Sequence, residues 1–172
     1  MAGKKRRKWL PFGWKVMAAY GLINIFFAII VPFSSYFGLP GQPMFVFAQG
    51  DAQFTGLTWG QIAALSPDLG TWIVLTMASM CAMMMGVGIL TFMIARHAYR
   101  NGERWAWKAL VAANVLTLAY YVFFIGGVHA AKGLPFWTWV PGTSGVGADL
   151  FVVIFAVWLA VGLWLPRKEL QG

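Results

Sequence analysis

Four long apolar runs separated by polar segments dominate the pattern of residues along this chain. The runs cover residues 16–37, 72–95, 106–128 and 146–165. Each is close to the ~20 residues that a helix needs to cross the hydrocarbon of a bilayer. The pattern therefore predicts an all-α fold: an integral membrane four-helix bundle that forms a single domain over residues 1–172.

Positive charge is confined to alternate polar segments. Twelve of the thirteen Lys and Arg residues fall in three short stretches, residues 4–15, 96–108 and 167–168. Only Lys132 lies in the other two segments, residues 38–71 and 129–145. Because cytoplasmic loops of membrane proteins carry the excess of Lys and Arg, we expect both the N-terminus and the C-terminus in the cytoplasm, and these two segments as outer loops.

The first outer loop carries signals for a short interfacial helix. Thr58 followed by Gln61 has the form of a capping box, and Ser66 with Pro67 marks the start of the next helix. The apolar residues 45–54 ahead of them are interpreted as a small hairpin or an irregular loop.

The composition agrees with a membrane location and narrows the partners. The chain is 60% hydrophobic and 10% charged, with a formal net charge of +8. Because the basic residues flank apolar runs, we expect them to bind anionic lipid headgroups, at about 1 kcal/mol per residue, and not nucleic acid. The headgroup contact is assigned to the opening basic run: Lys4, Lys5, Arg6, Arg7 and Lys8.

Few polar side chains lie inside the apolar runs, and three of them are predicted to share one depth. Asn24 and Asn114 each lie eight residues beyond the cytoplasmic start of their run, at residues 16 and 106, and Trp158 reaches a similar level on the fourth run. We interpret this interhelical polar layer as hydrogen bonds between helices, worth about 0.6 kcal/mol each. A small ligand or lipid cavity is the alternative.

The candidate ligand or ion site lies near the outer face. His129 follows the third apolar run and Asp149 lies early in the fourth, with Asp68 in the first outer loop. An acidic residue near a helix N-terminus is ordinarily favoured by the helix dipole, by about 0.3–1 kcal/mol. A His and Asp pair is also suited to binding a cation or to titrating near neutral pH. Both interpretations stay open.

Four sulfur-containing side chains share one predicted face of the second run: Met77, Met80, Cys81 and Met84. Thioethers and a thiol form a soft ligand set that suits Cu(I), so copper is an alternative interpretation. The ordinary one is flexible packing, because Ala78, Ala82 and Gly86 recur every four residues on the adjoining face. No cofactor is predicted. A single cysteine also excludes an internal disulfide and dithiol redox chemistry.

Two segments carry a resemblance to known proteins. Thr55-Gly56-Leu57-Thr58-Trp59 and the turn at residues 100–107 resemble a family of small prokaryotic integral membrane proteins with four transmembrane helices. The resemblance implies a multi-pass protein of the cell membrane. It implies no known activity, cofactor or catalytic residue.

Two classes of function fit these features. The favoured one is a structural or accessory subunit of a larger membrane assembly, because no Lys, Arg or Glu lies deep in the apolar runs and the outer loops are apolar. The alternative is a small oligomeric transporter or channel with a polar path near His129 and Asp149. A membrane enzyme built on these two residues comes third, because no nucleophile accompanies them and no catalytic residue is assigned. We therefore expect other membrane proteins, or a second copy of this chain, as partners.

Overall fold

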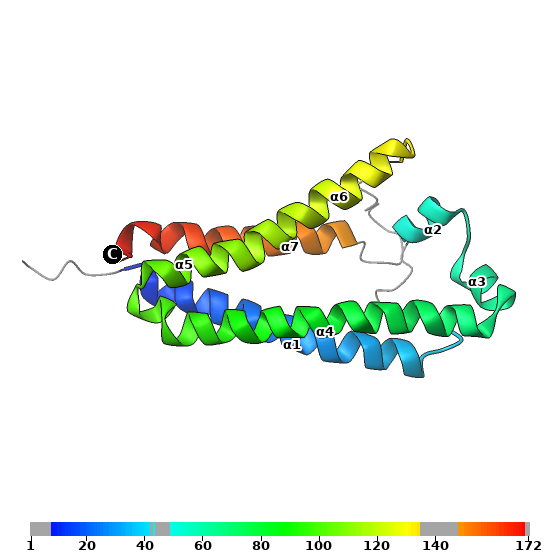
Figure 1. Ribbon diagram of the computed structural model, residues 1–172, viewed down its shortest axis with the longest axis horizontal. Coiled ribbons are helices and arrows are strands. Elements are labelled where there is room, and N and C mark those ends of the chain that lie inside the picture. The colour runs from blue at the N-terminus through cyan, green and yellow to red at the C-terminus, as the bar shows by residue number, and fades with distance from the viewer. Residues whose placement is uncertain (1–7, 42, 44–48, 135–147, 171–172) are drawn as a thin grey trace, which may run out of the picture.

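The computed structural model describes residues 8–41, 43, 49–134 and 148–170, and it is all-helical with no strand in these residues (Figure 1). The long helices lie side by side along the longest axis of the molecule. They are α1 (Leu10–Phe37), α4 (Pro67–His97), a continuous segment of α5 (Arg104–Leu110), η2 (Val111–Leu116) and α6 (Thr117–Ala131), and a shorter segment of α7 (Ala148–Leu159) and η3 (Ala160–Trp164).

Three helical segments are long and apolar enough to cross a membrane, by length and composition: Leu10–Phe37, Pro67–Asn101 and Arg104–Ala131. The chain therefore has the character of a membrane protein. The fourth predicted run is shorter as a helix, because α7 has 12 residues and η3 adds five, and its first residues lie outside the described part of the chain.

Proline and glycine, and not the edges of the apolar runs, mark two of the helix boundaries. α4 begins at Pro67, ahead of the apolar run that starts at residue 72, because proline at the first helical position gives up no hydrogen bond. After the short turn η1 (Tyr99–Asn101), Gly102 adopts a left-handed conformation with φ of 84°, which lets the chain reverse into α5. The helices of the first three runs consequently extend beyond the predicted runs.

Two short helices occupy the first outer loop. α3 (Trp59–Leu65) is the short helix that the sequence predicted, and its capping box is present. The Gln61 N–H donates to the Thr58 hydroxyl at 3.3 Å, and the Thr58 N–H donates to Gln61 Oε1 at 2.8 Å. α2 (Gln49–Thr55) was not predicted. The expectation of a hairpin or irregular loop is wrong for residues 49–54, which are helical.

Glycine lets α1 and α4 approach most closely. A Cβ atom placed on Gly21 would lie 2.7 Å from the Gly88 carbonyl oxygen and 2.8 Å from the Phe92 backbone nitrogen. A Cβ atom on Gly88 would lie 2.9 Å from the Gly21 carbonyl oxygen. The two helix backbones therefore touch at this crossing, as they do where small residues mediate helix packing in membranes.

The start of α1, the turn η1 and the last described helix η4 (Leu165–Glu169) lie at one end of the molecule, which we term the basic end (Figure 1). There the Glu169 carboxylate accepts hydrogen bonds from the backbone N–H groups of Lys8, Trp9 and Leu10 at 2.8–3.0 Å. Trp9 supplies no side-chain cap for α1. A carboxylate stabilises these groups because the first N–H groups of a helix have no intrahelical partners.

The buried core is concentrated towards the basic end. Its members come from α1, the end of α4, η1, α5, α7 and η3: Leu10, Met17, Ala18, Tyr20, Ala95, Ala98, Tyr99, Ala106, Leu110, Leu159 and Leu163. At the opposite end, which we term the far end, α6 leans away from α1 and α4 (Figure 1). None of its residues, Thr117–Ala131, is buried within the described chain. Tight packing at the basic end therefore coexists with an open arrangement at the far end.

Gly21→Ala is expected to lower the free energy of unfolding by about 1–3 kcal/mol, because the added methyl group would force α1 and α4 apart. Gly86→Ala is the matched control on α4, since nothing lies within 4 Å of a Cβ atom there. Reversible denaturation of each purified variant in detergent measures its free energy of unfolding. Equal effects of the two substitutions would contradict the close approach at Gly21.

Candidate functional site

A buried polar pair joins α4 to the helix that follows it. Asn114 lies in η2, a π-helical segment, and its Nδ2 donates to the Thr91 hydroxyl at 3.1 Å and to the Leu110 carbonyl at 3.0 Å. The Thr91 hydroxyl also lies 3.3 Å from Asn114 Oδ1, to which it can donate. Both side chains are buried, so these contacts replace the water that the amide would otherwise bind.

Asn24 makes a different contact from Asn114. It is also buried, but its Nδ2 donates to the Tyr20 carbonyl at 2.8 Å on its own helix. The side chain lies against Gly88, whose added Cβ atom would come within 3.1 Å of Asn24 Cβ. Within the described residues no hydrogen bond joins Asn24 to Asn114. The two asparagines thus lie on different helix interfaces.

Aromatic side chains donate to backbone carbonyls of neighbouring helices near the basic end. The Tyr99 hydroxyl donates to the Gly162 carbonyl at 2.8 Å, and Trp107 Nε1 donates to the Leu163 carbonyl at 2.9 Å. Both acceptors belong to η3, which is π-helical. These donors matter because a buried polar group needs a partner within the protein. Sequence reasoning missed Thr91, Tyr99 and Trp107 as hydrogen-bonding residues, because a polar atom on an apolar run does not show which neighbour it faces.

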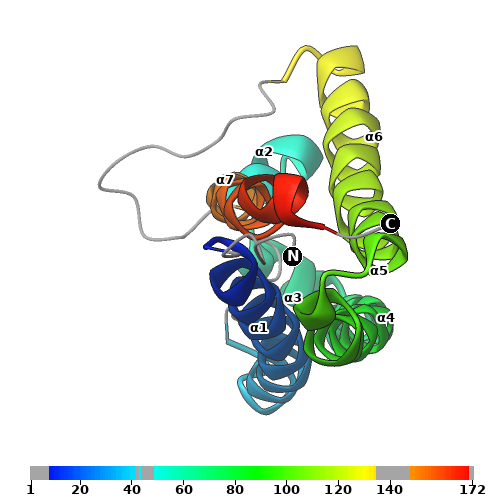
Figure 2. The ribbon, with the colours of Figure 1, turned by 90° about the vertical axis from the view of Figure 1, so that its left-hand side faces the viewer.

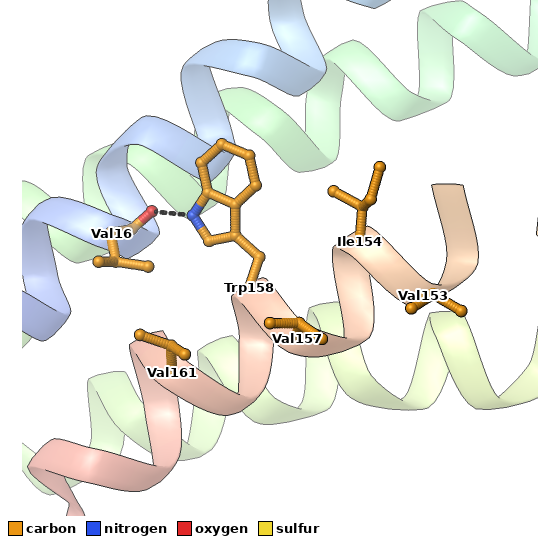
Figure 3. A pocket seen from close by; sticks show the side chains of 6 residues that line it. All are labelled: Val16, Val153, Ile154, Val157, Trp158 and Val161. Carbon is orange, nitrogen blue, oxygen red and sulfur yellow. Dashed lines mark hydrogen bonds between the residues drawn. The ribbon is translucent and has the colours of Figure 1, made fainter. Parts of the chain in front are cut away.

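An open groove of about 420 Å³ lies between α1 and α7 (Figure 3). Its lining is aliphatic apart from one indole: Val16, Val153, Ile154, Val157, Trp158 and Val161. Trp158 Nε1 donates to the Val16 carbonyl at 2.9 Å, so the polar atom of the indole is satisfied within the protein (Figure 3). The groove therefore offers an apolar packing surface, and none of its lining residues is ionisable.

His129 and Lys132 hold α2 against the last turn of α6. The Phe54 ring lies 5.3 Å from the His129 ring, centroid to centroid, and the Lys132 ammonium lies 3.9 Å from the centroid of the same Phe54 ring. His129 Nδ1 is also 2.8 Å from the Ile125 carbonyl oxygen. The contact is an aromatic and cation–π bridge between two helices, and the sequence did not reveal it.

The acidic residues predicted to accompany His129 belong to two other helices. Asp68 is exposed in the first turn of α4. Asp149 lies at the start of α7 by its backbone, and its side chain falls outside the described residues. A shared ion or ligand site at His129, Asp149 and Asp68 stays a prediction.

The sulfur residues of α4 are only partly gathered. Cys81 Sγ lies 3.7 Å from Met77 Sδ, whereas the Met80 side chain is 60% exposed and Met84 is half-buried. Among the described residues no group of three or more His, Cys, Asp and Glu side chains could hold a metal ion. Copper binding by the four sulfur residues stays an alternative prediction.

The basic end carries several pairs of a cation and an indole. Lys8 is exposed and its Nζ lies 5.2 Å from the centroid of the Trp9 ring, while Arg167 lies 5.5 Å from the Trp107 ring and 5.3 Å from the Trp164 ring. The rest of the opening basic run lies outside the described residues: Lys4, Lys5, Arg6 and Arg7. Stacked cations and indoles suit the region where lipid headgroups meet hydrocarbon.

Comparison of the chain with protein-family models, with curated proteins and with solved structures gives no match. Interpretation of the site therefore rests on its own geometry. That geometry consists of interhelical polar contacts, an apolar groove and a helix, α6, with an uncovered aromatic face.

Asn114→Leu and Thr91→Val are expected to interact in a double-mutant cycle, with a coupling of about 0.6–1.7 kcal/mol in the free energy of unfolding, because each removes the partner of the other. Asn24→Ala with Thr91→Val is the control pair and should be additive, since Asn24 bonds to its own helix. Denaturation in detergent measures both cycles. A coupling near zero for Asn114 and Thr91 would contradict their hydrogen bond.

Proposed function

We propose that the protein is a structural or accessory subunit of a larger membrane protein assembly, and that it contacts its partner through the aromatic face of α6. This face is formed by Tyr120, Phe123 and Phe124, which are all exposed. The proposal rests on the Tyr120 hydroxyl, which lies at hydrocarbon depth and has no hydrogen-bond partner among the described residues.

Tyr120 places a hydroxyl on a surface at hydrocarbon depth. It lies thirteen residues beyond Trp107, about 20 Å along the helix at about 1.5 Å per residue, within the ~30 Å of hydrocarbon. Its side chain is 68% exposed, and its hydroxyl has no hydrogen-bond partner among the described residues. An unsatisfied hydroxyl in hydrocarbon is costly, so a partner outside the described chain is favoured.

Exposed threonine and serine hydroxyls of α4 are satisfied locally. The Thr76 hydroxyl donates to the Trp72 carbonyl at 2.9 Å, and the Ser79 hydroxyl donates to the Leu75 carbonyl at 3.1 Å. A tyrosine hydroxyl is too far from its own backbone to bond in this way. Thr76 and Ser79 can therefore face lipid with their hydroxyls satisfied, whereas the Tyr120 hydroxyl cannot.

The neighbours of Tyr120 suit a protein contact. Its ring stacks on Phe124 with centroids 5.5 Å apart and planes inclined by 10°, and Phe123 beside them is 79% exposed. Aromatic residues held rigid in this way lose little conformational entropy on binding, and they dominate the energetics of many interfaces. The alternative, a small oligomeric transporter or channel with a polar path near His129 and Asp149, would place a second copy of this chain on the same face.

The topology we propose has four spans, with the segment of α7 and η3 as the fourth. Both termini then lie in the cytoplasm of a prokaryotic cell, and the basic end faces that compartment. Support comes from the twelve cations confined to one set of polar segments and from Glu169, which brings the last described helix to the start of α1.

A reporter fused to the C-terminus tests this topology. We expect a fluorescent protein fused there to fluoresce and an alkaline phosphatase fused there to be inactive, because only the first matures in the cytoplasm. A control fusion after Gly133, which follows α6, should give the opposite result. An active phosphatase at the C-terminus would indicate three spans.

A photo-crosslinking phenylalanine analogue at position 123 tests the α6 contact in native membranes. We expect a discrete product with a different membrane protein, because Phe123 lies on the proposed interface. The same analogue at Met83, which is 68% exposed on α4, is the control and should give no such product. Tyr120→Phe should weaken co-purification of the partner by up to about tenfold and leave thermal unfolding unchanged, because it removes one interhelical hydrogen bond.

The crosslinked products distinguish an accessory subunit from an oligomeric transporter. Only crosslinked copies of this chain would favour the oligomeric transporter. Equal products from positions 123 and 83 would contradict a specific face on α6.

A further inference from the structure

Two cations from separate segments meet at one indole at the basic end. The Lys15 ammonium of α1 lies 5.9 Å from the centroid of the Trp14 ring, and the Arg100 guanidinium carbon of η1 lies 5.9 Å from the same centroid. The two cations are therefore at most about 12 Å apart. Trp14 packs against the buried core, which fixes the position of the ring, whereas Lys15 and Arg100 are exposed. The arrangement is a rigid indole with a positive charge supplied by each of two elements.

Neither cation has a carboxylate partner in the part of the chain that the structure describes. The two glutamates at this end have other donors. Glu169 accepts backbone N–H groups at the start of α1, and Glu103 accepts a hydrogen bond from Trp105 Nε1. Both cations are exposed, so they are free to bind an anionic ligand.

The apolar surface beyond these cations is open. Leu22 and Phe26 lie seven and eleven residues after Lys15, which places them along the same face of α1, and both are about half exposed. A molecule whose anionic group binds Lys15 can therefore lay a hydrocarbon chain along α1. Arg167 offers a single guanidinium between two indoles, so it lacks the second cation that distinguishes this place.

We infer that Trp14, Lys15 and Arg100 form a headgroup site for an anionic phospholipid that carries two phosphates on one headgroup, a diphosphatidylglycerol. Arg100 can bind one phosphate through two parallel N–H groups, and Lys15 can bind the other as a point charge. Two phosphates on one headgroup can reach both cations even at the wider separations that the geometry allows, which a single phosphodiester cannot. Basic sites between transmembrane helices at the cytoplasmic surface are suited to such headgroups. The site lies at the opposite end from the proposed α6 contact and does not depend on a protein partner.

Native mass spectrometry of the full-length protein in detergent tests the site, with diphosphatidylglycerol, phosphatidylglycerol and phosphatidylcholine titrated separately. We expect the first diphosphatidylglycerol to bind at least about tenfold more tightly than phosphatidylglycerol, and phosphatidylcholine more weakly than both. The double variant K15Q/R100Q should lose at least about tenfold in diphosphatidylglycerol affinity, since each substitution removes a direct charge-assisted contact with a phosphate.

The double variant R104Q/K108Q is the matched control. It removes the same charge from exposed residues at the same end, and neither residue is stacked on Trp14. The affinity of this variant for diphosphatidylglycerol should change by less than about threefold. The single variants K15Q and R100Q give intermediate losses and replace the double variant if that one does not fold, as judged by circular dichroism.

Two results would overturn the inference. Equal losses in K15Q/R100Q and R104Q/K108Q would show a general effect of surface charge and no site. Equal binding of diphosphatidylglycerol and phosphatidylglycerol would show that the second phosphate contributes nothing, and that the headgroup class is wrong.

Discussion

Helices surrounded by lipid gain no hydrophobic stabilisation from pairing, so α1 and α4 must associate through close backbone contact. Gly21 and Gly88 provide that contact, because neither position has room for a Cβ atom. Once α1 is fixed on α4, its opposite side is available to η3, where Gly162 leaves space for Met17. α1 therefore lies beside both α4 and the segment of α7 and η3, and the core at the basic end depends on these contacts (Figure 2).

Hydrogen bonds across helices follow from the same environment. Tyr99, Trp107 and Trp158 each donate to a backbone carbonyl of another helix, and Asn114 pairs with Thr91. Each bond gives a partner to a polar group that the fold removes from water. Polar atoms are consequently used for assembly near the basic end. The Tyr120 hydroxyl departs from this pattern, and for that reason it points to a contact beyond the described chain.

The charged side chains at the basic end have two different roles. The Glu169 carboxylate is taken up by the first N–H groups of α1, so it stabilises the fold and joins the last described helix to the first. The cations Lys15 and Arg100 are held on an indole instead, with their charges exposed. Because the carboxylate serves the backbone, the cations remain available to an anionic ligand.

The sequence by itself determined the features that depend on residues within one or two helical turns. Apolar runs of membrane length, the capping box of α3, the start of α4 at Pro67 and the confinement of positive charge are all local patterns. Only the tertiary structure decided which polar atoms meet. Asn24 and Asn114 occupy the same position relative to the start of their apolar runs, but only the structure shows that one bonds to its own helix and the other to Thr91. The pairing depends on the rotation of each helix about its axis, which packing between helices sets and which no local pattern contains.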